Sequence, residues 1–213
     1  MRNISAENLG ALGSRQLVPR DFLWINARTM DTGAPVSGGF WSDVGNVAAE
    51  VLDPTTGMAV IRNFEGSSTL ISVGAVPLVA NLSVQETLIE LSQLDPSVEL
   101  MVRGYDLRQA GVEVYRGLLS PTSRLLVAPA LCRFVGFIDE VEIVTPDEGQ
   151  AGSIKLTCVS HTQEMTRANA DTRSDASQRR RSDTDNFFQD VTTIGEVEFF
   201  WGRRSGKIGA KKK

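Results

Sequence analysis

The chain has 213 residues, of which 41% are hydrophobic and 23% charged, and its formal net charge is −4. This length suffices for one large domain or two small ones with a buried core. No stretch approaches the roughly 20 consecutive apolar residues of a membrane-spanning helix, and the first residues lack the apolar run of a secretory signal. We therefore expect a protein without a membrane span that is made in a reducing cytoplasm.

Charge and composition change near residue 166. Residues 1–166 carry eight more acidic than basic side chains, whereas residues 167–213 carry four more basic than acidic ones. A basic end on an acidic chain contacts acidic protein or nucleic acid, or simply stays solvated. We expect three parts: a β-rich body over 1–166, an interface arm rich in arginine and aspartate over 167–202, and a basic, poorly ordered tail over 203–213.

Strand-like runs rich in Val, Ile, Phe and Thr fill most of residues 18–160. In chain order they are 21–27, 57–66, 68–76, 98–105, 112–120, 132–144 and 153–160. Turn signals occur at Thr32–Gly33, Asp53–Pro54, Ala110–Gly111 and Asp147–Glu148–Gly149. The runs do not alternate with long helices, as they would in a parallel α/β fold. The sequence therefore predicts a mainly β protein with an antiparallel sandwich-like or barrel-like body.

Helical patterns are short and few. Residues 5–14 begin with Ser5 and have Asn8 three residues later, which is a weak capping signal. Residues 84–94 fit either a helix or an alternating strand. The stretch 175–191 is polar, with only Phe187 and Phe188 as apolar anchors, so we expect a short polar helix or an ordered loop there.

The sequence offers little for catalysis. His161 is the single histidine, and the chain has no G-x-S-x-G nucleophile motif, so we expect an ordinary histidine at a strand end. Cys158 and His161 have a spacing found in zinc sites, but Cys132 is the only other soft ligand and a structural site needs four. Both cysteines lie in apolar runs, which predicts two small buried side chains and leaves a disulfide open.

Other chemical motifs are also weak. Glu140 and Glu142 are predicted to lie on one solvated strand face next to Asp139, and no residues place a second carboxylate opposite them. The glycine-containing stretch 33–39 lacks the Lys–Ser/Thr of a phosphate-binding loop. We expect no catalytic residue, no cofactor and no metal.

Three consecutive arginines, 179–181, form the most unusual feature. They are accompanied by Asp171, Asp175, Asp183 and Asp185, so the local charge is nearly balanced. Balanced Arg–Asp contacts fit ion pairing at a protein interface better than phosphate binding. Aromatic side chains and arginines dominate interface energies. The residues expected to form this interface are Arg173, Asp175, Arg179, Arg180, Arg181, Asp183, Phe187, Phe188, Phe199, Phe200 and Trp201.

Three segments together resemble one protein family. The first is an F-x-G-x-(I/M)-D strand at Phe134–Asp139, followed by the strand 154–159. The second is an arginine segment, and the third is a C-terminal segment in which aromatic residues precede Trp–Gly. The matching residues of the second and third are Arg173, Ser174, Asp175, Ser177, Gln178, Arg179 to Arg181, Phe187, Phe188, Trp201 and Gly202. With the N-terminal pattern LGSRQLVPRDFLWINA, they resemble the tail-tip hub proteins of long-tailed bacteriophages and gene transfer agents.

The resemblance implies a structural virion protein in the phage tail tip. Such hubs form β-rich rings, usually trimeric, that join the tail tube and its distal ring to the central tip or fibre protein. Expected partners are therefore other copies of the chain, the distal tail protein, the central tip protein and other tail-tip proteins. DNA would be met only as it passes through the channel.

Two departures from the family pattern matter. Lambda-type hubs end in a cysteine-rich part that binds an iron–sulfur cluster, whereas this sequence has only Cys132 and Cys158, so we expect no cluster. The usual FPGD turn is replaced by residues 183–191. The hexameric distal tail protein remains the main alternative. A cell-wall hydrolase of the tail tip and a nucleic-acid-binding module using the basic tail are further alternatives.

Overall fold

The computed structural model describes residues 4–14, 16–66, 69–77, 83–148, 152–168 and 170–194. The chain divides into two compact units, Met1–Thr166 and Arg167–Lys213. The first unit is mainly β, as the sequence predicted. Among the described residues, every helix is too short or too polar to cross a bilayer.

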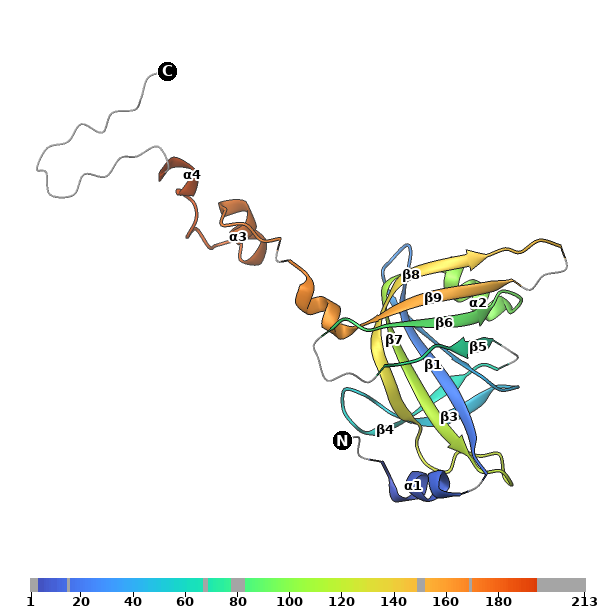
Figure 1. Cartoon of the computed structure of the whole chain (residues 1–213). Coiled ribbons are helices and arrows are strands. Elements are labelled where there is room, and N and C mark those ends of the chain that lie inside the picture. The colour runs from blue at the N-terminus through green and yellow to red at the C-terminus, as the bar shows by residue number, and fades with distance from the viewer. Residues whose placement is uncertain are drawn as a thin grey trace, which may run out of the picture. The chain divides into compact units, whose positions relative to one another are not determined.

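Seven strands form one curled, antiparallel half-barrel sheet in the first unit (Figure 1). Its strand order is β2-β1-β7-β8-β9-β6-β5, and strands β3 and β4 form a separate hairpin. The strands are β1 Val18–Thr29, β2 Pro35–Trp41, β3 Val47–Leu52, β4 Ala59–Phe64, β5 Leu70–Val73, β6 Glu86–Ser92, β7 Tyr105–Leu119, β8 Leu131–Val144 and β9 Ser153–Ser160. The ambiguous stretch 84–94 therefore contains a strand, β6.

The sheet has a hydrophobic core on each face. Leu23 and Ile25 of β1, next to one edge of the sheet, belong to the same core cluster as Leu70 of β5 at the other edge. The sheet therefore curls around one inner core. The intervening Phe22 points to the opposite face, where Phe64 of the β3–β4 hairpin covers it. We call this second cluster the outer core. The period-2 alternation of β1 thus supplies both cores.

Helix α1 spans Ala6–Gly13 and confirms the predicted N-terminal helix. The Ser5 hydroxyl caps it by accepting a hydrogen bond from the Asn8 backbone N–H at 3.3 Å. The Asn8 side-chain amide donates to the carbonyl oxygen of Pro129 at 3.3 Å. This bond connects the helix to the loop that precedes β8.

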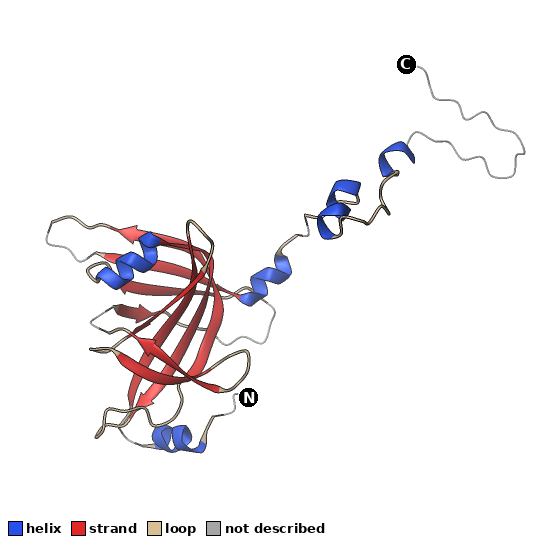
Figure 2. Cartoon of the chain, turned by 180° about the vertical axis from the view of Figure 1, so that it is seen from behind, coloured by secondary structure: helices blue, strands red, loops and turns tan. Residues whose placement is uncertain are grey.

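The strand predicted for residues 98–105 is wrong, because Pro96–Gly104 form helix α2. The Asp95 carboxylate accepts hydrogen bonds from the backbone N–H groups of Ser97 and Val98, and Pro96 occupies the first turn. Val98 and Met101, three residues apart, both enter the inner core. Helix α2 lies over the inner side of the sheet (Figure 2). The helix cap and the helical spacing of the buried residues favour a helix more strongly than the alternation of residues 98–105 favours a strand.

One of the predicted turns is also wrong. Ala110–Gly111 lies inside β7, where the pairing with β1 shifts between Asn26 and Arg28 and Gln109 has a φ of 57°. The chain therefore makes a β-bulge there rather than a turn. The turn at Thr32–Gly33 is confirmed, and Gly33 has a φ of 67°.

The second unit contains the predicted short polar helix. Helix α3 spans Asp175–Arg181, and a final helical turn, α4, spans Val191–Ile194. The 3-10 helix η1, His161–Thr166, belongs to the first unit. The predicted anchors Phe199, Phe200 and Trp201 and the basic tail 203–213 lie outside the described residues.

Candidate functional site

The arginine segment of the arm begins as a capped helix. The Ser174 hydroxyl accepts a hydrogen bond from the Ser177 backbone N–H at 3.3 Å, which satisfies one of the free donors at the start of α3. Asp175 stands in the first turn and Arg179, Arg180 and Arg181 in the last, which is the favourable order for a helix dipole. The Ser-Asp-x-x-Gln-Arg spacing is therefore that of a short helix with charges matched to its ends.

Two of the three arginines are held within the arm itself. Arg179 Nε lies 2.9 Å from Asp175 Oδ2, and its Nη2 donates to the Asn186 side-chain oxygen at 3.0 Å. Arg181 forms an ion pair with Asp171. The predicted Arg–Asp pairing therefore occurs inside one chain for these residues.

Asp185 fixes the turn after α3. The Gln178 amide donates to the Asp185 carboxylate at 2.5 Å, and the Phe187 backbone N–H donates to its other oxygen at 3.0 Å. These bonds, the first above all, hold the pKa of the Asp185 carboxyl below its usual value. The stretch after α3 thus forms a hydrogen-bonded turn of its own.

Among the other predicted arm residues that the structure describes, Phe188 is half-buried and the rest are exposed: Arg173, Arg180, Asp183 and Phe187. Within the described segments, the structure shows no ion pair for Arg173, Arg180 or Asp183. The Phe187 side chain is 81% exposed and meets Phe188 edge to face, with ring centroids 5.0 Å apart. Exposed aromatic and unpaired charged side chains on one short segment are typical of a contact surface.

The residues considered for catalysis and metal binding do not assemble into a site. His161 is exposed, and its ring meets Phe137 edge to face. Cys158 is buried in the inner core, which raises the pKa of its thiol to about 12. Cys132 is only half-buried, against the expectation, and packs against the outer core. The two thiols therefore lie on opposite faces of the sheet and do not form a disulfide. Among the described residues, no cluster of three metal-ligating side chains occurs.

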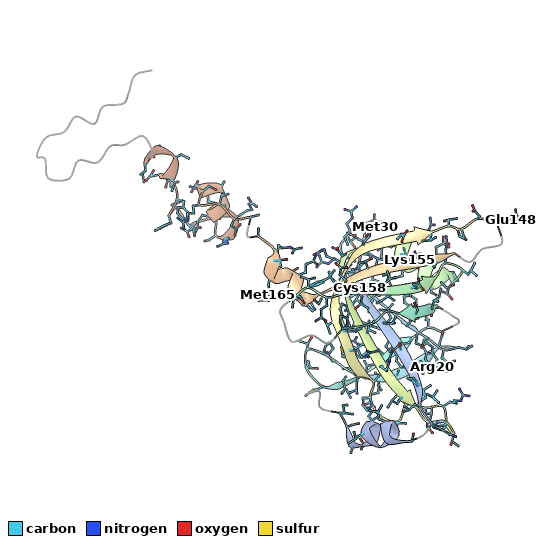
Figure 3. All side chains as sticks on the ribbon, in the orientation of Figure 1. Arg20, Met30, Glu148, Lys155, Cys158 and Met165 are labelled. Atoms are coloured by element: carbon cyan, nitrogen blue, oxygen red, sulfur yellow. The ribbon has the colours of Figure 1, made fainter. Side chains whose placement is uncertain are left out.

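The carboxylates of β8 lie on a solvated surface, as predicted. Asp139, Glu140 and Glu142 are exposed. Glu142 pairs with Lys155 of the neighbouring strand β9 at 3.5 Å. Lys155 and Cys158 both come from β9 (Figure 3). This cross-strand ion pair is an ordinary surface contact of the sheet.

An arginine between the hairpin and the sheet was not found by sequence reasoning. Arg62 of β4 forms an ion pair with Glu113 of β7, and its Nη1 donates to the Tyr115 hydroxyl at 3.0 Å. Its guanidinium carbon lies 4.9 Å from the Trp24 ring centroid. Burial, together with the hydrogen bond to Glu113, raises the pKa of the Tyr115 hydroxyl above its usual value. Arg62 and Glu113 are 51 residues apart, so no sequence spacing links them.

Strand β2 forms one edge of the seven-stranded sheet, and two grooves flank it. The hairpin groove, of about 480 Å³, lies towards β4, and the helix groove, of about 190 Å³, lies towards α2. Both are lined by Ser37, Gly38, Gly39 and Glu65. The hairpin groove adds Trp24, Val60, Ile61, Arg62 and Asn63, and the helix groove adds Val36, Phe40, Ser97, Leu100, Met101 and Tyr105.

No family model and no curated protein matches this chain.

Proposed function

We propose that this chain is a structural component of the tail tip of a long-tailed bacteriophage or gene transfer agent. In this role it forms a ring, trimeric in the hub, which joins the tail tube and distal tail ring to the central tip protein. DNA passes through the channel of the ring. The site of action is the virion.

One observation carries the proposal beyond the resemblance itself. The residues of the arginine motif, Ser174 to Arg181, form a capped and internally ion-paired helix in a compact unit separate from the β body. The described part of this unit buries little and exposes Phe187 and Arg180. A small ordered unit with so little core of its own is suited to docking on another protein, because its exposed side chains gain burial only there.

The mass of the purified chain in solution tests the ring. Light scattering after gel filtration is expected to give three times the 23.2 kDa of one chain, without the visible absorbance of an iron–sulfur cluster. A hexamer would favour the distal tail ring instead. A monomer that is also absent from purified tails would overturn the proposal.

The arm gives a second test with a matched control. Arg180→Ala leaves the described ion pairs of α3 intact, so we expect unchanged amide exchange over 170–194 but about tenfold less incorporation into tails, as expected for an interface arginine. Arg179→Ala removes the contacts to Asp175 and Asn186, so faster amide exchange in α3 is expected. Normal incorporation of the Arg180→Ala chain would show that this arginine makes no partner contact.

A further inference from the structure

The edge of β2 is open for a short distance and closed beyond it. Trp41 N–H donates to the Glu65 carbonyl at 3.0 Å, and Glu65 N–H donates to the Gly39 carbonyl at 2.9 Å. Backbone groups alternate along a strand, so the Gly39 N–H and both backbone groups of Ser37 point the same way, away from β1. No partner for them occurs within the described segments. Pro35, which has no N–H, ends this edge on the other side.

The two grooves lie where the side chains of an added strand would fall. Successive side chains of a strand point to opposite faces, so a strand along Ser37–Gly39 would place alternate side chains in the hairpin groove and in the helix groove. Ile61 in the first groove is 71% exposed and Leu100 in the second is 57% exposed. Strand addition uses this arrangement: the backbone supplies hydrogen bonds and the pockets supply specificity.

We propose that the segment 195–202 of a second copy of this chain adds to the β2 edge as an extra strand. Its sequence, GEVEFFWG, alternates, with Val197, Phe199 and Trp201 at every second position. This apolar set matches the apolar side of the hairpin groove, formed by Trp24, Val60 and Ile61. The segment follows α4 directly and lies outside the described residues.

Charge complementarity supports a copy of the same chain as the donor. Glu65 is exposed where the two grooves meet, and the first unit carries an acidic excess. The donor segment carries Glu196 and Glu198, but the six basic residues of 203–213 follow it directly, so this end of the chain is basic as a whole. A donor segment and an acceptor edge on different parts of one chain make a head-to-tail contact, which forms a ring when the rotation between successive copies closes. This inference rests on the proposed function, because it requires that the chain forms a ring. It identifies strand addition at the β2 edge as the contact between neighbouring copies in that ring.

Photo-crosslinking of the full chain tests the contact. Phe199 is replaced by p-benzoylphenylalanine, and ¹⁴N- and ¹⁵N-labelled chains are mixed in equal amounts, unfolded and refolded together, then irradiated. Mass spectrometry is expected to find crosslinks from residue 199 to 36–40 and 59–65 that join a light chain to a heavy one. Crosslinks within single chains, crosslinks to other surfaces, or no crosslinks at the highest attainable concentration would each overturn the proposal.

Two edge variants and one control sharpen the result. Ser37→Pro removes the free N–H, and Ile61→Lys places a charge in the hairpin groove, so each is expected to lower the crosslink yield about tenfold. Ile71→Lys places the same charge on exposed β5, at the other edge of the sheet, and should leave the yield unchanged. Equal yields for Ile61→Lys and Ile71→Lys would contradict the proposed docking place.

The outcomes for ring and strand are separable. A trimer or hexamer without crosslinks to β2 would overturn strand addition and leave the ring intact. A crosslink to β2 in a protein that never enters tails would support strand addition and overturn the tail-tip function.

Discussion

Replacement of Gly136 by alanine is expected to lower the free energy of unfolding by about 3 kcal/mol. A Cβ atom at this position would lie 2.0 Å from the Val159 carbonyl oxygen and 2.9 Å from the Phe134 ring. The carbonyl belongs to the neighbouring strand β9 and cannot rotate away without loss of pairing between β8 and β9. Urea denaturation measures the change, which corresponds to a midpoint of thermal unfolding lower by about 6 to 12 °C.

The control for this prediction is Gly10→Ala in α1. A Cβ atom there meets nothing within 4 Å, and alanine favours a helix over glycine, so stability should rise by about 0.5 kcal/mol. Gly136 is the glycine of the F-x-G-x-(I/M)-D motif, so its place in the motif has a packing reason. Equal stability of the Gly136→Ala and wild-type chains would show that the strands can separate there without cost.

Replacement of Arg62 by alanine is expected to cost about 2 to 4 kcal/mol of stability. The Arg62 and Glu113 side chains are only 13% and 14% exposed, so loss of the cation leaves a nearly buried carboxylate without its counter-ion. The contact of the guanidinium with the Trp24 ring is lost as well. Because these contacts join the hairpin to the sheet, amide exchange in β3 and β4 should accelerate before that in β7.

A surface ion pair provides the comparison for Arg62. Arg103 and Glu99 of α2 are both more than half exposed, so Arg103→Ala should change stability by no more than about 0.5 kcal/mol. A double-mutant cycle of Arg62→Ala with Glu113→Gln isolates the pair energy. If Arg62→Ala costs no more than Arg103→Ala, the hairpin is held by its apolar contacts alone.

Local patterns in the sequence predicted much of the body. The predicted strands 132–144 and 153–160 match β8 and β9 almost residue for residue. From Phe134 to Ile138 in β8, and from Ile154 to Cys158 in β9, every second residue is buried and the intervening ones are half-buried. The strand prediction for residues 98–105 failed because Val98, Leu100 and Val102 alternate as in a strand. The helical face that packs on the inner core consists instead of Val98, Met101 and Val102, and Leu100 is exposed. The Asp95–Pro96 capping signal was present in the sequence and would have distinguished the two.

The arm was only partly predictable. Its charge balance predicted Arg–Asp pairing, and its polar composition predicted a short helix or an ordered loop, of which the structure shows the helix, α3. Which arginines are internally paired depends on the positions of Asp171 and Asn186 after the chain turns, so Arg179 and Arg181 could not be separated from Arg180 beforehand. The assignment of this arm to a phage tail tip stays a prediction from the resemblance.

The sequence by itself determined the mainly β class, the antiparallel body, the N-terminal helix and the polar, charge-balanced composition of the arginine segment. These follow from periodicity, capping residues and charge, which act over a few neighbouring residues. Only the tertiary structure decided the curl of the sheet, the Arg62–Glu113 contact and the open edge of β2 between two grooves. Each of these depends on strands far apart in the chain, and pairing between them is set by packing rather than by any local pattern.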